Sequence, residues 1–149
     1  MSEYEDLLKL AKHAVQKSIV ALDEIIEDKG EHQFSSVIPK EMKAEIDLVL
    51  ENIILAELKS TDISILSEES GRQSINDEST LQWIVDPLDG TVNFLRSIGC
   101  SGISIGLWKD KKPVFGVIGE YPSRNIFWGG EVFGAFVNDA VIKVSELCN

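Results

Sequence analysis

The sequence predicts an α+β fold in which layered helices pack on one face of a largely antiparallel sheet. Two observations favour this class. Apolar residues recur every three or four positions over about the first 60 residues, whereas short β-branched and aromatic runs separated by turn residues make up the rest. The length of 149 residues fits one domain, so residues 1–149 are expected to share one core.

Two amphipathic helices are expected in the N-terminal part. Residues 3–28 have helical apolar spacing, at Leu8, Ala11, Val15, Ile19, Leu22 and Ile26. A second helix is expected up to residues 59–60, with the same spacing at Ile46, Val49, Leu50, Ile53, Ile54 and Leu58. Residues 30–39 show no periodicity and are expected to form the loop between the two helices.

Short strands are expected after residue 61. Their expected ranges are 63–66, 81–85, 102–108, 114–121, 125–128 and 132–137. Polar residues 67–80 are expected to form a loop. The turn residues at 109–113 and 122–125 are typical of connections between antiparallel strands.

Charge and hydropathy exclude several classes of function. Lys and Arg total 14 against 25 Asp and Glu, which gives a formal net charge of −11. Such an acidic chain repels phosphate backbones, so no nucleic-acid partner is expected. The longest run without a charged residue, 97–108, has 12 residues, short of the roughly 18 that a membrane helix needs, so no membrane association is expected. The acidic N-terminus lacks the features of a signal peptide, and a cytoplasmic location is expected.

The most informative stretch follows the strand expected at 81–85. Pro87 removes a ladder donor and is expected to stop the strand, which leaves the Asp86 carboxylate at the strand end. Asp89 is expected to cap a short helix that starts at Gly90, and a tight turn can bring both carboxylates and the Leu88 carbonyl together. Hard cations such as Mg²⁺ prefer these oxygen ligands. Asp-Pro and Asp-Gly pairs are, however, most often simple turns.

Three further carboxylates are candidates for the same site, although each also has a purely structural interpretation. Glu68 follows its strand as Asp86 follows its own, so neighbouring strands can deliver both to one edge of the sheet; otherwise Glu68 and Glu69 simply begin a solvated loop. Asp47 is expected to open the second helix, where the helix dipole alone explains an acidic residue. Carboxylates that converge without a metal repel each other, so at least one is expected to titrate above its usual pKa.

Several strings together resemble the inositol monophosphatase-like family of Mg²⁺-dependent, lithium-sensitive phosphatases. The family's central motif is met without a break by DPLDGTVNF at 86–94, and its upstream Glu-Glu pair by residues 68–69. GAFVND at 134–139 is similar to a further family turn. The resemblance covers essentially the whole chain and implies the N-terminal part of the family's αβαβα fold.

The resemblance also implies roles for individual residues. The implied metal ligands are the side chains of Glu68, Asp86 and Asp89 and the carbonyl of Leu88. Thr91 and Asp47 would position the attacking water, and the amides of Gly90 and Thr91 would hold the phosphate. Glu69 and Asn93 belong to the same two motifs and are further candidates. A small phosphorylated substrate, Mg²⁺ as cofactor and a homodimer are implied as well.

The expected function is therefore hydrolysis of a phosphate monoester on a small polyol such as inositol monophosphate. One alternative is a bisphosphate phosphatase that acts on adenosine 3′,5′-bisphosphate or a sugar bisphosphate, and another is a non-catalytic remnant that binds metal. The family's later Trp-Asp motif has no counterpart here, because no Trp of this sequence is followed by Asp. The 149-residue chain alone is expected to be poorly active and prone to self-association.

Overall fold

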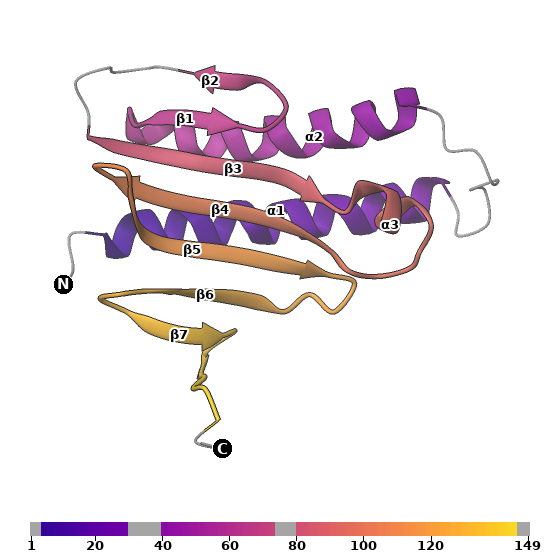
Figure 1. Cartoon of the computed structure of the whole chain (residues 1–149). Helices are drawn as coiled ribbons and strands as arrows, with labels where there is room; N and C mark the ends of the chain where they lie inside the picture. The colour runs from indigo at the N-terminus through magenta and orange to yellow at the C-terminus, as the bar shows by residue number, and fades with distance from the viewer. Residues whose placement is uncertain (1–3, 30–39, 74–79, 146–149) are drawn as a thin grey trace.

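The protein is described from a computed structural model, which covers residues 4–29, 40–73 and 80–145 (Figure 1). The expected loop at 30–39 lies outside the described residues, as do residues 74–79 of the expected loop at 67–80. Within the described ranges the chain forms two long helices followed by a sheet, in the order that the sequence predicts.

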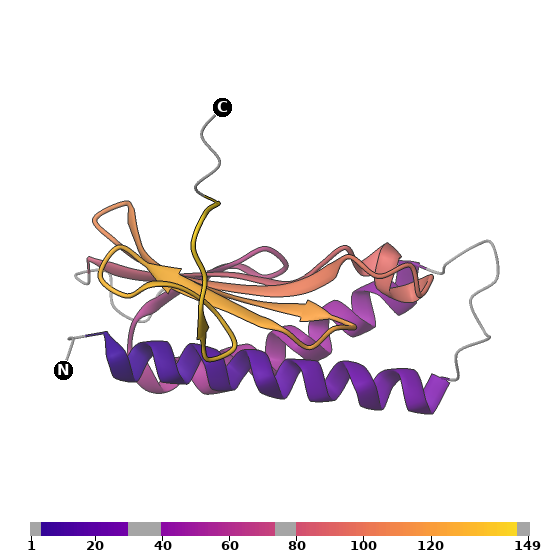
Figure 2. The same cartoon turned by 90° about the horizontal axis from the view of Figure 1, so that it is seen from below.

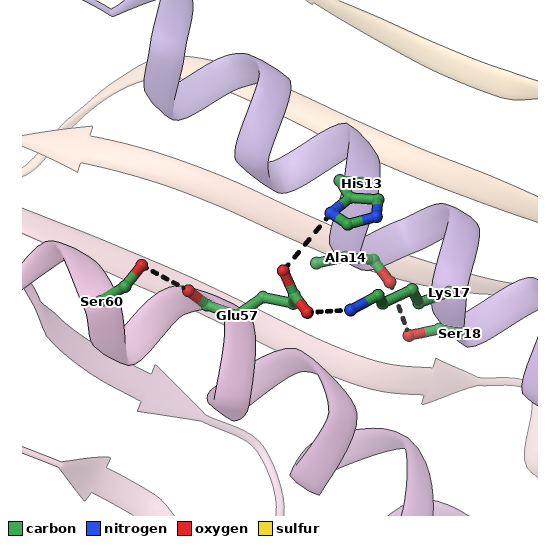
Figure 3. Close-up of polar contacts among 6 residues, drawn as sticks. All are labelled: His13, Ala14, Lys17, Ser18, Glu57 and Ser60. Atoms are coloured by element: carbon green, nitrogen blue, oxygen red, sulfur yellow. Dashed lines mark hydrogen bonds and ion pairs between the residues drawn. The ribbon is translucent and has the colours of Figure 1, made fainter.

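The helices pack against each other and against the sheet. α1 spans Glu5–Lys29 and α2 spans Lys40–Leu58, and a short 3-10 helix, η1, continues α2 over Lys59–Thr61. Glu57 of α2 accepts a hydrogen bond from Lys17 of α1 and lies 3.4 Å from Nδ1 of His13 (Figure 3). None of the described helices combines the length and apolar character that a membrane span requires.

Eight strands form one sheet in the order β2-β1-β3-β4-β5-β6-β7-β8. Their bounds are β1 Ser64–Ser67, β2 Gly71–Gln73, β3 Leu81–Asp89, β4 Ser101–Lys109, β5 Lys112–Tyr121, β6 Ile126–Gly130, β7 Gly134–Val137 and β8 Ala140–Val141. A five-residue helix, α3, spans Thr91–Leu95 between β3 and β4. Every neighbouring pair is antiparallel except β1 and β3, which run parallel, so the prediction of a largely antiparallel α+β fold is confirmed.

Both helices lie on the same side of the sheet (Figure 2). The core fills the space between these two layers. Its largest fully buried side chains are Trp83, Leu22, Ile46, Leu50, Ile54, Leu58, Ile65, Leu95, Ile103, Ile105, Leu107 and Val15. They come from α1, α2 and α3 and, in the sheet, from inward-facing positions of β1, β3 and β4, as a half-buried sheet requires.

Four predictions about the strands and the start of α3 are wrong. Pro87 does not stop β3, which runs on to Asp89 through a register shift between Asp86 and Asp89. Because parallel pairing with β1 already ends at Val85, the missing N–H of Pro87 breaks no ladder bond on that side. The last expected strand begins at Gly134 instead of residue 132, because residues 131–133 form a turn. β2 lies within the expected loop at 67–80, since pairing with β1 outweighs its weak β propensity.

The fourth concerns the start of α3. The residue that caps this helix is Gly90, and no side chain makes a capping hydrogen bond, so Asp89 is not its cap. Gly90 has a φ of +74°, and a Cβ there would lie 2.7 Å from the carbonyl oxygen of Cys100. Both features favour glycine at position 90. The neighbouring Asp89 side chain is exposed to solvent.

Candidate functional site

The parallel strands β1 and β3 bring two acidic residues to one edge of the sheet. Ser67 pairs with Val85, and the amide of Glu68 donates to the Val85 carbonyl at 3.0 Å. Glu68 directly follows β1, and Asp86 directly follows the last residue of β3 that pairs with β1, so the two lie at the same level, as the sequence predicts. The geometry is the ordinary consequence of parallel pairing, in which equivalent strand ends lie side by side.

In this region, Asp86 is the residue whose carboxyl has the most strongly shifted pKa. Burial, the charge of Glu68, a hydrogen bond with Glu68 and the charge of Asp89 raise the pKa of Asp86 to about 6. Carboxylates this close cannot all ionise without repulsion, and the opposing effect, a backbone hydrogen bond from Leu88, does not offset it. The expectation that at least one carboxylate of the group titrates above its usual pKa is confirmed.

Two more acidic side chains lie close to this pair. Burial, followed by the charges of Asp47 and Glu68, raises the pKa of Glu69, although Lys43 opposes the shift. Burial also raises the pKa of Asp47, against the lowering effects of its hydrogen bond from Thr91 and of Lys43. Negative charge thus accumulates where the ends of β1 and β3 face the middle of α2.

Thr91 ties β3 to α2. Its side chain is buried, and Oγ1 lies 2.9 Å from Oδ1 of Asp47 and 2.9 Å from the carbonyl oxygen of Leu88. The prediction that Asp47 opens the second helix is wrong, because α2 begins at Lys40. The helix dipole therefore does not explain Asp47, which is 3% exposed and is held by Thr91.

Glu51 is a buried acid that the sequence reasoning missed. It lies one turn after Asp47 on α2, and its Oε1 accepts hydrogen bonds from the amide of Ser70 at 3.1 Å and the hydroxyl of Ser70 at 2.8 Å. One face of α2 therefore holds the turn after β1 through Glu51 and the turn after β3 through Asp47. The spacing of four residues between two acids is the signal that could have revealed this pair.

Asn93 has a supporting position in this region. Its Nδ2 donates to the carbonyl of Cys100 at 3.2 Å, which links α3 to the start of β4. The structure therefore gives Asn93 a contact within the fold.

The donor set at this edge suits a hard cation in type and in charge. Carboxylates and a carbonyl are the ligands that Mg²⁺ prefers, and a cation would relieve the repulsion that raises the pKa of Asp86. The hydroxyl of Ser67, directly before Glu68, is buried without a hydrogen-bond partner in the described part of the chain, so an ion or water can complete this end of β1.

The arrangement is not yet a closed coordination shell. Among residues 4–29, 40–73 and 80–145, no three Asp, Glu, His or Cys side chains are gathered closely enough to hold a metal ion. Glu68 and Asp86 share a hydrogen bond, whereas Asp89 interacts with Asp86 only through the electrostatic effect of its charge. A cation would draw the three carboxylates together.

Comparison with known proteins gives a consistent result. The profile of the inositol monophosphatase family matches residues 3–147. The chain is 35% identical over 151 aligned positions to inositol monophosphatase 1 of Solanum lycopersicum, an alignment that covers 95% of this chain and 53% of the relative. It is 38% identical over 101 residues to a fructose-1,6-bisphosphatase/inositol-1-monophosphatase of Thermococcus kodakarensis, covering 68% of this chain and 39% of the relative.

Solved structures agree with the sequence matches. The extragenic suppressor protein suhB of Bartonella henselae superimposes with a TM-score of 0.79 at 31% identity, over 95% of this chain and 55% of the other. The inositol monophosphatase of Anabaena gives a TM-score of 0.80 at 28% identity, over 97% of this chain and 52% of the other. The chain thus spans about half the length of most of these relatives.

Proposed function

The chain belongs to the inositol monophosphatase family, and from this premise we propose that it carries the metal- and phosphate-binding part of a Mg²⁺-dependent phosphatase. The substrate class is a phosphate monoester of a small polyol such as inositol monophosphate. The observation that carries the proposal is the acidic group at the ends of β1 and β3, where burial and the neighbouring Glu68 and Asp89 raise the pKa of Asp86 to about 6. A strong pKa shift caused by burial and by specific neighbouring charges is typical of a functional site.

The proposed ligands of Mg²⁺ are the carboxylates of Glu68, Asp86 and Asp89 and the carbonyl of Leu88. When bound, Mg²⁺ supplies charge neutralisation at the phosphate and a lowered pKa for its water. The role of the protein is then to fix the position of these ligands. Strand pairing between β1 and β3 fixes Glu68 against Asp86, and Glu51 holds the turn that follows Glu68.

Thr91 and Asp47 are the proposed pair that orients the attacking water. The Thr91 hydroxyl has a single proton, and two acceptors, Oδ1 of Asp47 and the Leu88 carbonyl, lie 2.9 Å away. The proton satisfies only one acceptor at a time, so the hydroxyl oxygen keeps lone pairs for a water donor and Asp47 keeps acceptor capacity. Phosphoryl transfer depends chiefly on such positioning and on charge neutralisation.

The start of α3 is the proposed phosphate position. The first amides of a helix have no acceptor within the helix, and in α3 these belong to Thr91 and the residues that follow. Gly90 directly precedes these amides in a left-handed backbone conformation, and it has no side chain that could block access to them. The amides of Gly90 and Thr91 are therefore proposed to donate to the phosphate oxygens, opposite the Mg²⁺ ligands.

A sugar bisphosphate is the second candidate substrate. It is favoured by the relative from Thermococcus kodakarensis, whose name combines fructose-1,6-bisphosphatase with inositol-1-monophosphatase. The proposed Mg²⁺ and phosphate contacts involve only the phosphate, so they serve either substrate. Lithium sensitivity is part of the same proposal, because Li⁺ would compete for the carboxylate ligands.

The test is release of inorganic phosphate from inositol monophosphate, fructose 1,6-bisphosphate and adenosine 3′,5′-bisphosphate. We expect slow, Mg²⁺-dependent release by the 149-residue chain, and a loss of at least 100-fold in Asp86→Asn. Asp110→Asn is the matched control, because Asp110 lies in the exposed turn between β4 and β5 and should retain full release. Absence of Mg²⁺-dependent release with every substrate, in a chain that still binds Mg²⁺, would identify a non-catalytic metal-binding protein instead.

A further inference from the structure

A groove between the two long helices lies apart from the candidate site. It has a volume of about 570 Å³, and it is lined by residues from 21–28 of α1 and from 45–53 of α2. Among the residues that the structure describes, no strand contributes to this lining, and neither do Asp47, Thr91 or the proposed Mg²⁺ ligands. Both helices lie on one side of the sheet (Figure 2), so the groove belongs to the helix layer. The proposed phosphatase chemistry does not use this surface.

The floor of the groove is apolar. Its side chains are Ala21 and Ile25 of α1 and Ile46, Val49 and Ile53 of α2. They are spaced by three or four residues on each helix, so each helix turns one apolar stripe toward the groove. Ile46 is 1% exposed whereas Val49 is 39% exposed, so the floor extends from the core to the solvent. Such a floor between two helices can accept the apolar face of a third helix.

The rim of the groove is acidic. Its charged side chains are exposed to solvent and are those of Glu24, Glu27 and Asp28 of α1 and Glu45 of α2. No Lys, Arg or His lines the groove in the described part of the chain. The three acids of α1 make no ion pair with any other side chain that the structure describes. The middle of α1 differs, because Lys17 and His13 there pair with Glu57 of α2 (Figure 3).

Two of these acids lie where the helix itself disfavours them. α1 ends at Lys29, so Glu27 and Asp28 belong to its last turn. The C-terminal end of a helix carries a partial negative charge, and acidic residues there lower the stability of the helix. Glu5 and Asp6, in the first turn of α1, have the favourable placement. Helix stability therefore does not explain the acids at the end of α1, whereas a positively charged occupant of the groove does.

We propose that the groove binds a basic amphipathic helix of a different polypeptide. Apolar side chains on one face of that helix pack on the floor, and the Lys or Arg side chains beside them pair with the rim. The floor runs from Ile46 to Ile53 on α2, a length of about 10 Å or two helical turns. An occupant of two to three turns therefore covers it.

Charge disfavours the other classes of occupant. Nucleic acid and anionic lipid would meet the acidic rim of a chain whose formal net charge is −11. Two copies of this chain that met groove to groove would oppose two acidic rims. A cation alone would neutralise the rim but leave the apolar floor in water. The proposal is independent of the proposed function, because it involves neither metal nor phosphate.

Binding of synthetic peptides to the 149-residue chain, followed by fluorescence anisotropy, tests the proposal. The basic probe is a labelled helix of about 14 residues, or four turns, with Leu along one face and Lys elsewhere. The acidic probe has Glu in place of each Lys, and the shuffled probe has the same Leu and Lys residues spread evenly around the helix. We expect the basic probe to bind about 10-fold more tightly than the shuffled probe, because only the basic probe presents an apolar face. The acidic probe should not bind.

Two double variants separate the rim from the general acidity of the chain. Glu24→Gln with Glu27→Gln removes two rim charges, whereas Asp62→Asn with Asp110→Asn removes two exposed charges away from the groove. The rim variant should bind the basic probe about 10-fold more weakly, and the control variant should change its affinity less than about twofold. Both should keep the circular dichroism spectrum of the wild-type chain, because all four side chains are exposed.

Val49→Ser tests the floor. It removes apolar contact without a change of charge, so the basic probe should bind about 5-fold more weakly. Val132→Ser is the matched control, because it makes the same change at an exposed residue in the turn between β6 and β7. It should leave the affinity for the basic probe unchanged.

Amide chemical shifts of isotope-labelled protein locate the basic probe, and the largest changes are expected at Ala21, Ile25, Val49 and Ile53. Equal affinity for the basic and shuffled probes overturns the proposal, since the chain then binds cations through its overall charge alone. Failure of the basic probe to bind at millimolar concentration, or equal weakening by both double variants, overturns it as well. Shifts at these residues that grow with protein concentration in the absence of any probe would assign the groove to a second copy of this chain and also overturn it.

Discussion

Acidic residues near the end and near the middle of α2 have opposite electrostatic surroundings. Near the end of α2, Glu57 contacts Lys17 and His13 of α1, and the hydrogen bond and charge of Lys17, with a smaller contribution from His13, lower the pKa of the Glu57 carboxyl despite partial burial (Figure 3). At the sheet edge facing the middle of α2, Asp86 meets Glu68 and Asp89, and the pKa of Asp86 is raised to about 6. A carboxylate that stabilises a fold has its pKa lowered by its partners, whereas carboxylates that raise one another's pKa indicate a place for a cation.

The largest expected effect concerns the link between these acids and the chemistry. Thr91→Val removes the hydroxyl that contacts Asp47 and Leu88 while it keeps the shape of the side chain. We expect kcat to fall about 100-fold, in the range typical for one lost positioning or charge-stabilising contact. The affinity for Mg²⁺, measured by calorimetry, should change less than threefold.

Thr61→Val is the matched control for this experiment. Thr61 also makes partly buried hydrogen bonds: its hydroxyl donates to the Leu58 carbonyl and accepts from the indole nitrogen of Trp83. It lies, however, at the other end of β1 from Glu68. It should lose stability and keep kcat. If both variants lose kcat equally, Thr91 acts only through stability and has no positioning role.

The second effect is the change in the free energy of unfolding when Asp86 is substituted. Its sign should be opposite to that expected for Glu57. The folded-state pKa of Asp86 lies above its ordinary value of 3.8, so the native state binds the proton more tightly than the unfolded state. In metal-free protein, ionisation of Asp86 therefore destabilises the fold as the pH rises from about 4 to above 6. Asp86→Asn should increase the free energy of unfolding by about 2 kcal/mol at pH 8 and change it little at pH 4.

Urea unfolding in the presence of a chelator measures this gain. Asp110→Asn makes the same chemical change in an exposed turn and should alter stability by less than about 0.5 kcal/mol. A destabilised Asp86→Asn at pH 8 would mean that Asp86 supports the fold as Glu57 does, and the contrast between the two groups would disappear.

The third effect concerns Glu51, which holds the turn after Glu68. Glu51→Gln keeps the side-chain length but weakens the acceptor of the two Ser70 hydrogen bonds. We expect Mg²⁺ to bind about 10-fold more weakly, at the lower end of the usual effect of changing residues that orient metal ligands. Asp62→Asn, an exposed change after η1, should leave Mg²⁺ affinity unaltered. Equal affinities of the Glu51→Gln and wild-type chains would show that strand pairing alone orients Glu68.

The smallest effect is expected at Glu57. The folded-state pKa of Glu57 is lowered, so its ion pairs stabilise the protein above the ordinary pKa of 4.5 and are lost as the pH falls through the lowered value. Because the partners are half exposed, Glu57→Gln should cost only about 0.5 kcal/mol at pH 7 and nothing at a pH low enough to protonate the Glu57 carboxyl. Chemical unfolding at both pH values checks this. Stabilisation by the substitution would contradict the assignment of Glu57 to a structural role.

Local patterns predicted most of the fold. The helical spacing of α1 and the period of two in β4 and β5 depend on burial of one face, and burial decides both elements in the structure. The first turns of α2, over residues 40–45, carry little apolar periodicity, so the start of α2 and the depth of Asp47 within it were not predictable. Pro87 was misjudged because the register shift that accommodates it depends on the partner strand.

The candidate site was predictable in its motifs but not in its supports. The neighbouring positions of Glu68 and Asp86 follow from strand order, which the motif spacing reveals. The contacts of Glu51 with Ser70 and of Asp47 with Thr91 join residues 19 and 44 positions apart. Such contacts depend on how α2 crosses the sheet, which no local pattern in the sequence specifies.

Calorimetric titration of Mg²⁺ tests the central claim most directly, namely that the carboxylates at the ends of β1 and β3 gather around a cation. Wild-type protein and Asp110→Asn should bind Mg²⁺ with equal affinity. Asp86→Asn should bind at least 10-fold more weakly, because one negative ligand is lost from a group held by charge. Equal Mg²⁺ affinity in all three proteins would contradict the account and place any metal site elsewhere in the chain.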